Sequence, residues 1–202
     1  DAISAQTKHV SSDVSEILAL SRSGQLLSDL QIERLFKARG DDFSAVCQAA
    51  DSLRKKTNGD DVSFVVNRNI NYTNVCYFKC QFCAFSKGKL SEDLRGKPYD
   101  LDHSEIQRRV HEAWARGATK VCMQGGIHPQ YTGDTYVEIL KTVKTAEPHM
   151  HIHAFSPLEV WQGAATMGVE LEEYLLILKN AGLDTLPGTA GEVLDDEVRA
   201  II

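Results

Sequence analysis

Short apolar segments alternate with helical patterns from residue 61 onward, and this alternation constrains the fold more than any other feature of the sequence. The predicted strands cover residues 62–70, 119–123, 150–155 and 183–186. Strands that alternate with helices of about 10 to 15 residues form βαβ units with a parallel sheet. We therefore predict an α/β fold in which residues 61–202 form the first four βα units of a partial (β/α) barrel. Because a closed barrel needs more units, we expect the chain to be truncated at the C-terminus.

Residues 1–60 differ from the rest, because they show three helical patterns and no strand. The predicted helices cover 12–21, 28–39 and 42–56, and the second begins with a capping-box pattern at Ser28. The third is expected to turn Phe43, Val46, Cys47 and Leu53 inward. This segment holds no catalytic constellation, so we interpret it as an N-terminal helical extension.

Three cysteines directly after the first predicted strand give the strongest chemical signal. Cys76, Cys80 and Cys83 have the spacing C-x3-C-x2-C. A closed tetrahedral zinc site needs four ligands, whereas three thiolates on one tight loop suit a 4Fe-4S cluster whose fourth iron stays open to a small molecule. The loop also follows a strand's carboxyl end, where (β/α) barrels carry their active sites. The alternative is a zinc-stabilised binding domain, in which a distant His or Cys completes the site.

Charge and composition exclude several classes of protein. The net charge of −6 gives no indication of nucleic-acid binding, and no apolar run approaches the length of a membrane span. Five cysteines, three of them clustered, fit a reducing compartment, so we expect a cytoplasmic protein. The chain begins at Asp1 rather than Met, which suggests a piece of a longer polypeptide.

The cysteine spacing, with Phe82 directly before Cys83, resembles the radical S-adenosylmethionine (SAM) superfamily. The resemblance implies that the three cysteines bind a 4Fe-4S cluster and that SAM chelates the open iron through its amino and carboxylate groups. It also implies that Phe82 lies at the cofactor. Gln124-Gly125-Gly126, after the second strand, corresponds to the glycine turn that receives the SAM amino group. The usual form of that turn is Gly-Gly-Glu, so the match is partial.

Polar residues follow the third and fourth predicted strands. Ser156, Glu159 and Glu192 are candidates to bind the SAM ribose or the substrate. An equally good interpretation makes Ser156 the cap of a helix that begins at Pro157, and Glu192 a carboxylate in a helix's first turn.

Three alternating histidines lie on or beside the third predicted strand. His149, His151 and His153 should point to one face, since side chains alternate along a strand. They could bind a metal, but we favour a polar lining of the barrel interior. A role in proton handling or substrate contact makes His151 and His153 the candidate catalytic residues.

Further stretches narrow the resemblance within the superfamily. Residues 67–76, 83–87, 124–129 and 153–159 resemble the subgroup that acts on tyrosine-derived and futalosine-type substrates, and 77–100 is most similar to the tyrosine-using members of the deazaflavin (FO) synthase family. Residues 11–202 carry the resemblance, over about the first half to two thirds of that family's catalytic domain.

The family resemblance implies a reaction and its partners. The reaction transfers the 4-hydroxybenzyl group of L-tyrosine to 5-amino-6-(D-ribitylamino)uracil. It needs a reductant such as ferredoxin or flavodoxin, and a second radical SAM subunit or fused domain that completes the deazaflavin. A futalosine enzyme of the menaquinone pathway is the alternative within the superfamily.

Among the neighbours of the cysteines, we expect Asn69, Asn71, Tyr72 and Asn74 to shape the loop through side-chain hydrogen bonds to the backbone.

Overall fold

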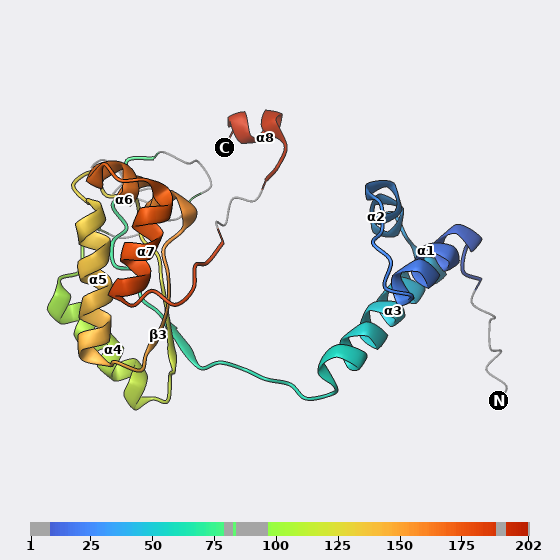
Figure 1. The fold of residues 1–202 in the computed structure, drawn as a ribbon, viewed down its shortest axis with the longest axis horizontal. Coiled ribbons are helices and arrows are strands. Elements are labelled where there is room, and N and C mark those ends of the chain that lie inside the picture. The colour runs from blue at the N-terminus through green and yellow to red at the C-terminus, as the bar shows by residue number, and fades with distance from the viewer. Residues whose placement is uncertain (1–8, 79–82, 84–96, 189–192, 202) are drawn as a thin grey trace. The chain divides into compact units, whose positions relative to one another are not determined.

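The computed structural model describes residues 9–78, 83, 97–188 and 193–201. The chain divides into two compact units, Asp1–Ser63 and Phe64–Ile202 (Figure 1). Within the part that the structure describes, every helix is too short or too polar to cross a bilayer.

The first unit is helical, with α1 at Ser12–Arg22, α2 at Asp29–Phe36 and α3 at Gly40–Asn58. The predicted capping box is present, since the Ser28 hydroxyl accepts from the Gln31 amide and the Gln31 side chain accepts from the Ser28 amide. Helix α2 stops at Phe36, before the predicted end at residue 39, and Gly40 begins α3 with φ of 59°. A glycine tolerates this left-handed conformation, which lets the chain turn between the two helices.

The prediction of an inward face on α3 is wrong. No residue of α3 is buried: Phe43 and Leu53 are 56% and 58% exposed, and Cys47 is exposed as well. The buried residues described in this unit are Val14, Ile17, Leu18 and Ala38, most of them on α1. A helix can bury an apolar stripe only against a neighbour that covers it, and the helical unit is too small to cover 19 residues of α3.

The second unit is built on a parallel sheet with strand order β1-β2-β3. Its strands are β1 (Asn67–Asn69), β2 (Lys120–Met123) and β3 (His151–Ala154). Helices α4 (His103–Ala115) and α5 (Gly133–Ala146) connect them, and α6 (Pro157–Met167), α7 (Leu171–Ala181) and α8 (Asp196–Ile201) follow. Helices α4 to α7 pack side by side along the sheet (Figure 1). The predicted α/β architecture is confirmed.

Two predicted strands are shorter than expected. Only residues 67–69 of the segment 62–70 pair with β2, and Val62 and Phe64 are 90% and 85% exposed. Residues 183–186 contribute a single parallel bridge, between Thr185 and His153. A β-rich sequence becomes a strand only where a neighbouring strand supplies hydrogen bonds. Among the described residues, no further strand flanks β1 or Thr185 on its outer side.

One face of the sheet packs on the helices and carries the core. Val121, Met123, Ile152 and Ala154 are fully buried there, against apolar side chains of α4, α5 and α7. The largest of these partners are Ile106, Val110, Leu140, Val143, Tyr174 and Leu178.

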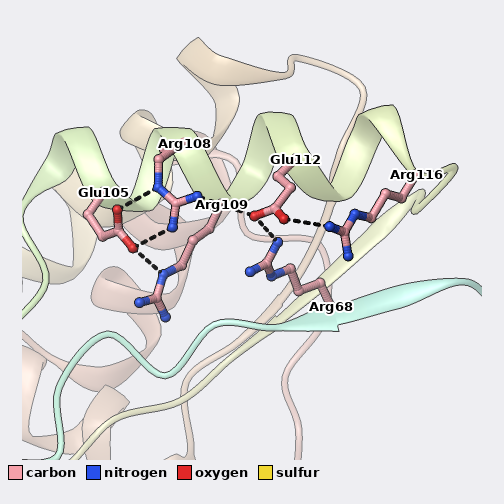
Figure 2. Close-up of polar contacts among 6 residues, drawn as sticks. All are labelled: Arg68, Glu105, Arg108, Arg109, Glu112 and Arg116. Carbon is pink, nitrogen blue, oxygen red and sulfur yellow. Dashed lines mark hydrogen bonds and ion pairs between the residues drawn. The ribbon is translucent and has the colours of Figure 1, made fainter.

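Arg68 of β1 lies in register with Val121 and reaches α4, where its Nη1 donates to Glu112 at 2.7 Å (Figure 2). Along the same helix, Arg108 and Arg109 bind Glu105 and lower the pKa of that carboxyl to about 2. These side chains are at least partly exposed, so each pair adds little stability. We interpret the network as a link between β1 and α4, not as a functional site.

Candidate functional site

The cysteine loop leaves the carboxyl end of β1. Cys76 and Cys83 are half-buried, and neither forms a disulfide bond. Cys80 and Phe82, together with Glu192, lie outside the described residues, so the full set of predicted ligands is not seen.

The first part of the loop is held by its own backbone against the turn after β2. The Gly126 amide donates to the Thr73 carbonyl at 3.0 Å, and the Tyr77 amide donates to the Ile127 carbonyl at 3.1 Å. On the other side, the Leu101 amide donates to the Tyr72 carbonyl at 2.8 Å. The segment that presents Cys76 is therefore anchored on both sides.

Side chains of the loop add further anchors, as predicted for Asn74. The Asn74 amide group donates to the Lys97 carbonyl at 3.2 Å and accepts from the Tyr99 amide at 2.8 Å. Tyr72 behaves differently from the prediction, because its hydroxyl binds a carboxylate and not the backbone.

The two glycines after β2 are needed for contact with this loop. A Cβ on Gly126 would lie 2.8 Å from the Cβ of Cys76 and would overlap the Val75 carbonyl, and a Cβ on Gly125 would overlap the Tyr72 ring. Sequence reasoning linked these glycines to close approach of a ligand. The structure adds a second reason, because any side chain here would push the cysteine loop away.

Both amides of the glycine turn are used inside the protein. Gly125 N–H donates to Oε1 of Glu159 at 3.0 Å, and Gly126 N–H is bound to Thr73 as above. No donor among the described residues reaches the carbonyl oxygens of Gln124, Gly125 or Gly126. The Gln124 side chain makes one long contact, from Nε2 to the Gly188 carbonyl at 3.4 Å.

Glu159 is the buried polar centre of the site. Its side chain is 1% exposed, and it accepts from the Tyr72 hydroxyl, from Gly125 N–H and from Ser156 N–H, the last at 2.6 Å. Burial raises the pKa of Glu159 to about 8, although the amides of Ser156 and Gly125 act in the opposite direction.

Ser156 caps α6, as one of the two sequence interpretations predicted. Its hydroxyl accepts from the Glu159 amide at 3.3 Å, which completes a capping box, and Pro157 occupies the first position of the helix.

The turn between β3 and α6 is strained. Phe155 is fully buried and has φ of 66°, a left-handed conformation that a bulky residue rarely adopts. This conformation places its ring against Tyr72 and Tyr136, at centroid distances of 6.1 and 5.0 Å. Together with Tyr131 these rings form an aromatic cluster beside the loop.

Tyr136 of α5 is a residue that sequence reasoning missed. Its hydroxyl is buried and has no hydrogen-bond partner among the described residues. Burial raises the pKa of Tyr136, and the neighbouring Cys76 thiol adds to the rise. An apolar helical position was the only signal in the sequence, and it predicts core packing alone.

The histidines lie on the sheet face opposite the helices. His151 Nε2 and His153 Nδ1 both lie within hydrogen-bond distance of the Thr185 hydroxyl, at 2.9 and 2.7 Å, so the two imidazoles share a face as predicted. Burial lowers the pKa of His153, with smaller contributions from Lys120 and His151.

His149 precedes β3 and is exposed. Among the described residues, no group of three or more His, Cys, Asp or Glu side chains is placed so that it could hold a metal ion.

A parallel α/β sheet with a cysteine loop after its first strand defines the class of protein. Residues 70–202 match the model of the radical SAM superfamily, and the chain belongs to that superfamily. Membership implies a 4Fe-4S cluster and SAM.

Individual relatives carry more specific names. The chain is 48% identical over 191 residues to "FO synthase" of Mycobacterium leprae (strain TN), covering 93% of this chain and 22% of that protein. It is 45% identical to "5-amino-6-(D-ribitylamino)uracil--L-tyrosine 4-hydroxyphenyl transferase" of Nostoc sp. (strain PCC 7120 / SAG 25.82 / UTEX 2576), covering 79% and 41%. The chain thus spans about a fifth of the length of the FO synthase relatives.

Solved structures share the fold. The FeFe-hydrogenase maturase HydG from Carboxydothermus hydrogenoformans is similar with a TM-score of 0.59 at 14% identity, over 87% of this chain and 47% of that one. Methylornithine synthase is similar with a TM-score of 0.56 at 16% identity, over 88% and 58%. At such low identity the likeness concerns the fold alone, and it supports the prediction of a partial radical-SAM-type barrel.

Proposed function

We propose that this chain is part of a radical SAM enzyme of deazaflavin biosynthesis, which transfers the 4-hydroxybenzyl group of L-tyrosine to 5-amino-6-(D-ribitylamino)uracil. The observation that carries the proposal is the 44–48% identity, across 93% or more of the chain, to proteins named FO synthase. The Nostoc relative, at 45% identity, is named for both substrates. The proteins named FO synthase are several times longer than the chain, which leaves room for a second radical SAM domain in the same polypeptide.

In this proposal Cys76, Cys80 and Cys83 hold the cluster. The described part of the loop fits that role, because Cys76 and Cys83 are half-buried, are not in disulfides and follow a strand's carboxyl end. The buried Tyr136 hydroxyl lacks a partner among the described residues, and Cys76 contributes to its raised pKa, so we include this hydroxyl as a candidate donor toward the cluster site. When bound, the cluster and SAM supply a carbon radical that abstracts hydrogen from the substrate.

The glycine turn is suited to an ammonium group. Both of its amides are bound within the protein, whereas no described donor reaches its carbonyl oxygens. An ammonium group donates hydrogen bonds and needs such acceptors. This arrangement supports Gln124, Gly125 and Gly126 as contacts for the SAM amino group. Phe82, Ser156, Glu159 and Glu192 stay predictions as further contacts.

The histidine face is the proposed substrate side. His151 and His153 both contact the Thr185 hydroxyl, and the lowered pKa of His153 keeps that imidazole neutral near pH 7. A neutral imidazole can accept a proton or a hydrogen bond from a substrate hydroxyl. We therefore retain these two residues as the catalytic candidates.

The test is anaerobic reconstitution of the full-length protein with iron and sulfide, followed by addition of SAM, dithionite, L-tyrosine and the uracil. We expect cluster absorbance, formation of 5′-deoxyadenosine and consumption of tyrosine. Cys76→Ala should abolish all three, whereas Cys47→Ala, which removes an exposed cysteine of α3, should leave them unchanged.

Different failures contradict different parts of the proposal. Binding of one zinc in place of about four iron and four sulfide would overturn the cluster assignment. Cleavage of SAM without consumption of tyrosine would overturn only the substrate assignment. A parallel reaction with the aminodeoxyfutalosine precursor tests the futalosine alternative, which the comparisons do not support.

A further inference from the structure

We propose that Glu159 is a positioning residue whose buried carboxyl group locks the cysteine loop to the glycine turn. The inference rests on the proposed function only in taking the cysteine loop as the cluster site. It does not depend on the identity of the substrate.

The carboxyl group joins three segments that are far apart in the sequence. Oε1 accepts from the Tyr72 hydroxyl, four residues before Cys76, and from Gly125 N–H in the glycine turn. Oε2 accepts from Ser156 N–H at the start of α6. Because one oxygen receives both Tyr72 and Gly125, a displacement of that oxygen changes the positions of the loop and the turn together.

Hydrogen bonds and steric contacts act on the same pair of segments. Gly125 lies so close to the Tyr72 ring that a Cβ would overlap it, and Gly126 is equally close to the Val75 carbonyl. The glycines permit the close approach, and Glu159 maintains it. Glu159 reaches the loop through the Tyr72 hydroxyl and the glycine turn through Gly125 N–H, so its effect on the cluster site passes through these two residues.

Burial of a carboxyl group is costly, and a core that needed only packing would use an apolar side chain here. The chain also accepts a left-handed Phe155 at the same corner, a conformation that a bulky residue rarely adopts. Two unfavourable features at one corner support a specific role for the contact between Glu159 and the loop.

The experiment compares hydrogen exchange in the full-length protein before any cluster is added. Tyr72→Phe removes one donor to Glu159. Glu159→Gln keeps the shape but sets an amide NH2 group against the Gly125 or the Ser156 amide, so one of the two bonds is lost. We expect the amides of Gly126 and Tyr77 to exchange at least about tenfold faster in both variants, while amides of α7 keep their protection.

Tyr174→Phe is the matched control. It also removes a buried tyrosine hydroxyl bond, from Tyr174 to the Gly133 carbonyl at 2.9 Å, but this bond joins α7 to α5. We expect exchange at Gly126 and Tyr77 to stay at the parent rate in this variant.

A merely structural role for Glu159 predicts another result. If Tyr72→Phe and Glu159→Gln speed exchange evenly across the second unit, or if Tyr174→Phe loosens the loop as much, the proposal is overturned. If Glu159→Gln does not fold, Tyr72→Phe alone decides the question. After reconstitution we also expect faster loss of iron to a chelator from Tyr72→Phe than from Tyr174→Phe. Failure of the transferase assay would not affect the exchange result.

Discussion

The helical unit and the α/β unit differ in whether their polar contacts include buried ones. In the helical unit the connections lie at the surface, where Arg34 binds Asp13 at 2.6 Å and Asp42 at 3.0 Å. The α/β unit has partly exposed ion pairs as well, such as Arg68 with Glu112, but it adds internal connections, from Tyr72 to Glu159 and from Tyr174 to Gly133. All the predicted site residues belong to the second unit. The comparison teaches that the candidate site was built where burial could fix a side chain in one position.

The cause of the difference is the amount of surface that each architecture can cover. Helices stacked on a parallel sheet bury one whole face of it, whereas three short helices cover one another only along narrow stripes. Accordingly, Leu140 of α5 is fully buried, while Phe36 of α2 is 80% exposed.

The largest expected effect is a difference in stability between the units when one apolar side chain in each is replaced by alanine. Leu140→Ala should lower the free energy of unfolding of the α/β unit by about 2–5 kcal/mol, because it leaves a cavity in a packed core. The same kind of change in the helical unit, Phe36→Ala, should alter stability by no more than about 0.5 kcal/mol. Urea unfolding of each variant measures both. Equal losses would contradict the contrast between the units.

The two units should respond to pH in opposite directions. The pKa of Glu159 is raised from 4.5 to about 8 in the folded state, so between these values the folded chain binds a proton that the unfolded chain releases. Its contribution to stability is complete below about pH 4.5 and is lost as the pH rises through about 8. In the helical unit, the Ser11 amide and Arg34 lower the pKa of Asp42. The contribution of Asp42 to stability is therefore present above its usual pKa of 3.8 and is lost on acidification.

Urea unfolding at pH 5.5 and pH 8.5 tests this prediction for Glu159. The parent protein should lose more stability between the two values than Glu159→Gln, whose side chain does not titrate. The difference between the two proteins isolates Glu159 from the histidines. An identical pH dependence in both would contradict the raised pKa.

A smaller difference in stability is expected between variants of two buried tyrosines of the α/β unit. Tyr174→Phe should lower the free energy of unfolding by about 1–2 kcal/mol, because it leaves the Gly133 carbonyl without its donor. Tyr136→Phe should be neutral or slightly stabilising in the cluster-free protein, since its hydroxyl has no partner among the described residues. Thermal unfolding of both variants provides the measurement. A loss for Tyr136→Phe as large as that for Tyr174→Phe would show that its hydroxyl is bound.

The smallest expected effect is at the surface of the helical unit. Arg34→Gln removes the guanidinium that binds Asp13 and Asp42, and these are exposed or partly exposed ion pairs. We expect a small decrease in the helical unit's melting temperature at low salt, and no difference from the parent protein near 1 M salt because of screening. A decrease that persists at high salt would show that the contact is not mainly electrostatic.

Local patterns in the sequence predicted much of the fold. The predicted capping box at Ser28 and the predicted serine cap of α6 are both present. The strands were less predictable. Only three residues of the predicted strand 62–70 form β1, and the predicted strand 183–186 makes a single bridge. Capping and periodicity act within a few residues, whereas a strand depends on a partner that is distant in the sequence.

The inward face assigned to α3 failed for the same reason. Phe43 and Leu53 have the spacing of a buried stripe, but spacing says nothing about whether another element covers it. Likewise the sequence marks Tyr136 as an ordinary core position, and only the structure shows that its buried hydroxyl has no hydrogen-bond partner among the described residues.

The sequence by itself determined the parallel α/β fold, the spacing of the three cysteines and the glycine turn one strand later. All three follow from patterns that are local in the chain. Only the tertiary structure decided that Glu159 meets Tyr72, 87 residues away, and that the same carboxylate binds Gly125. No periodicity encodes such a meeting, because it depends on how parallel strands bring their carboxyl ends to one edge of the sheet.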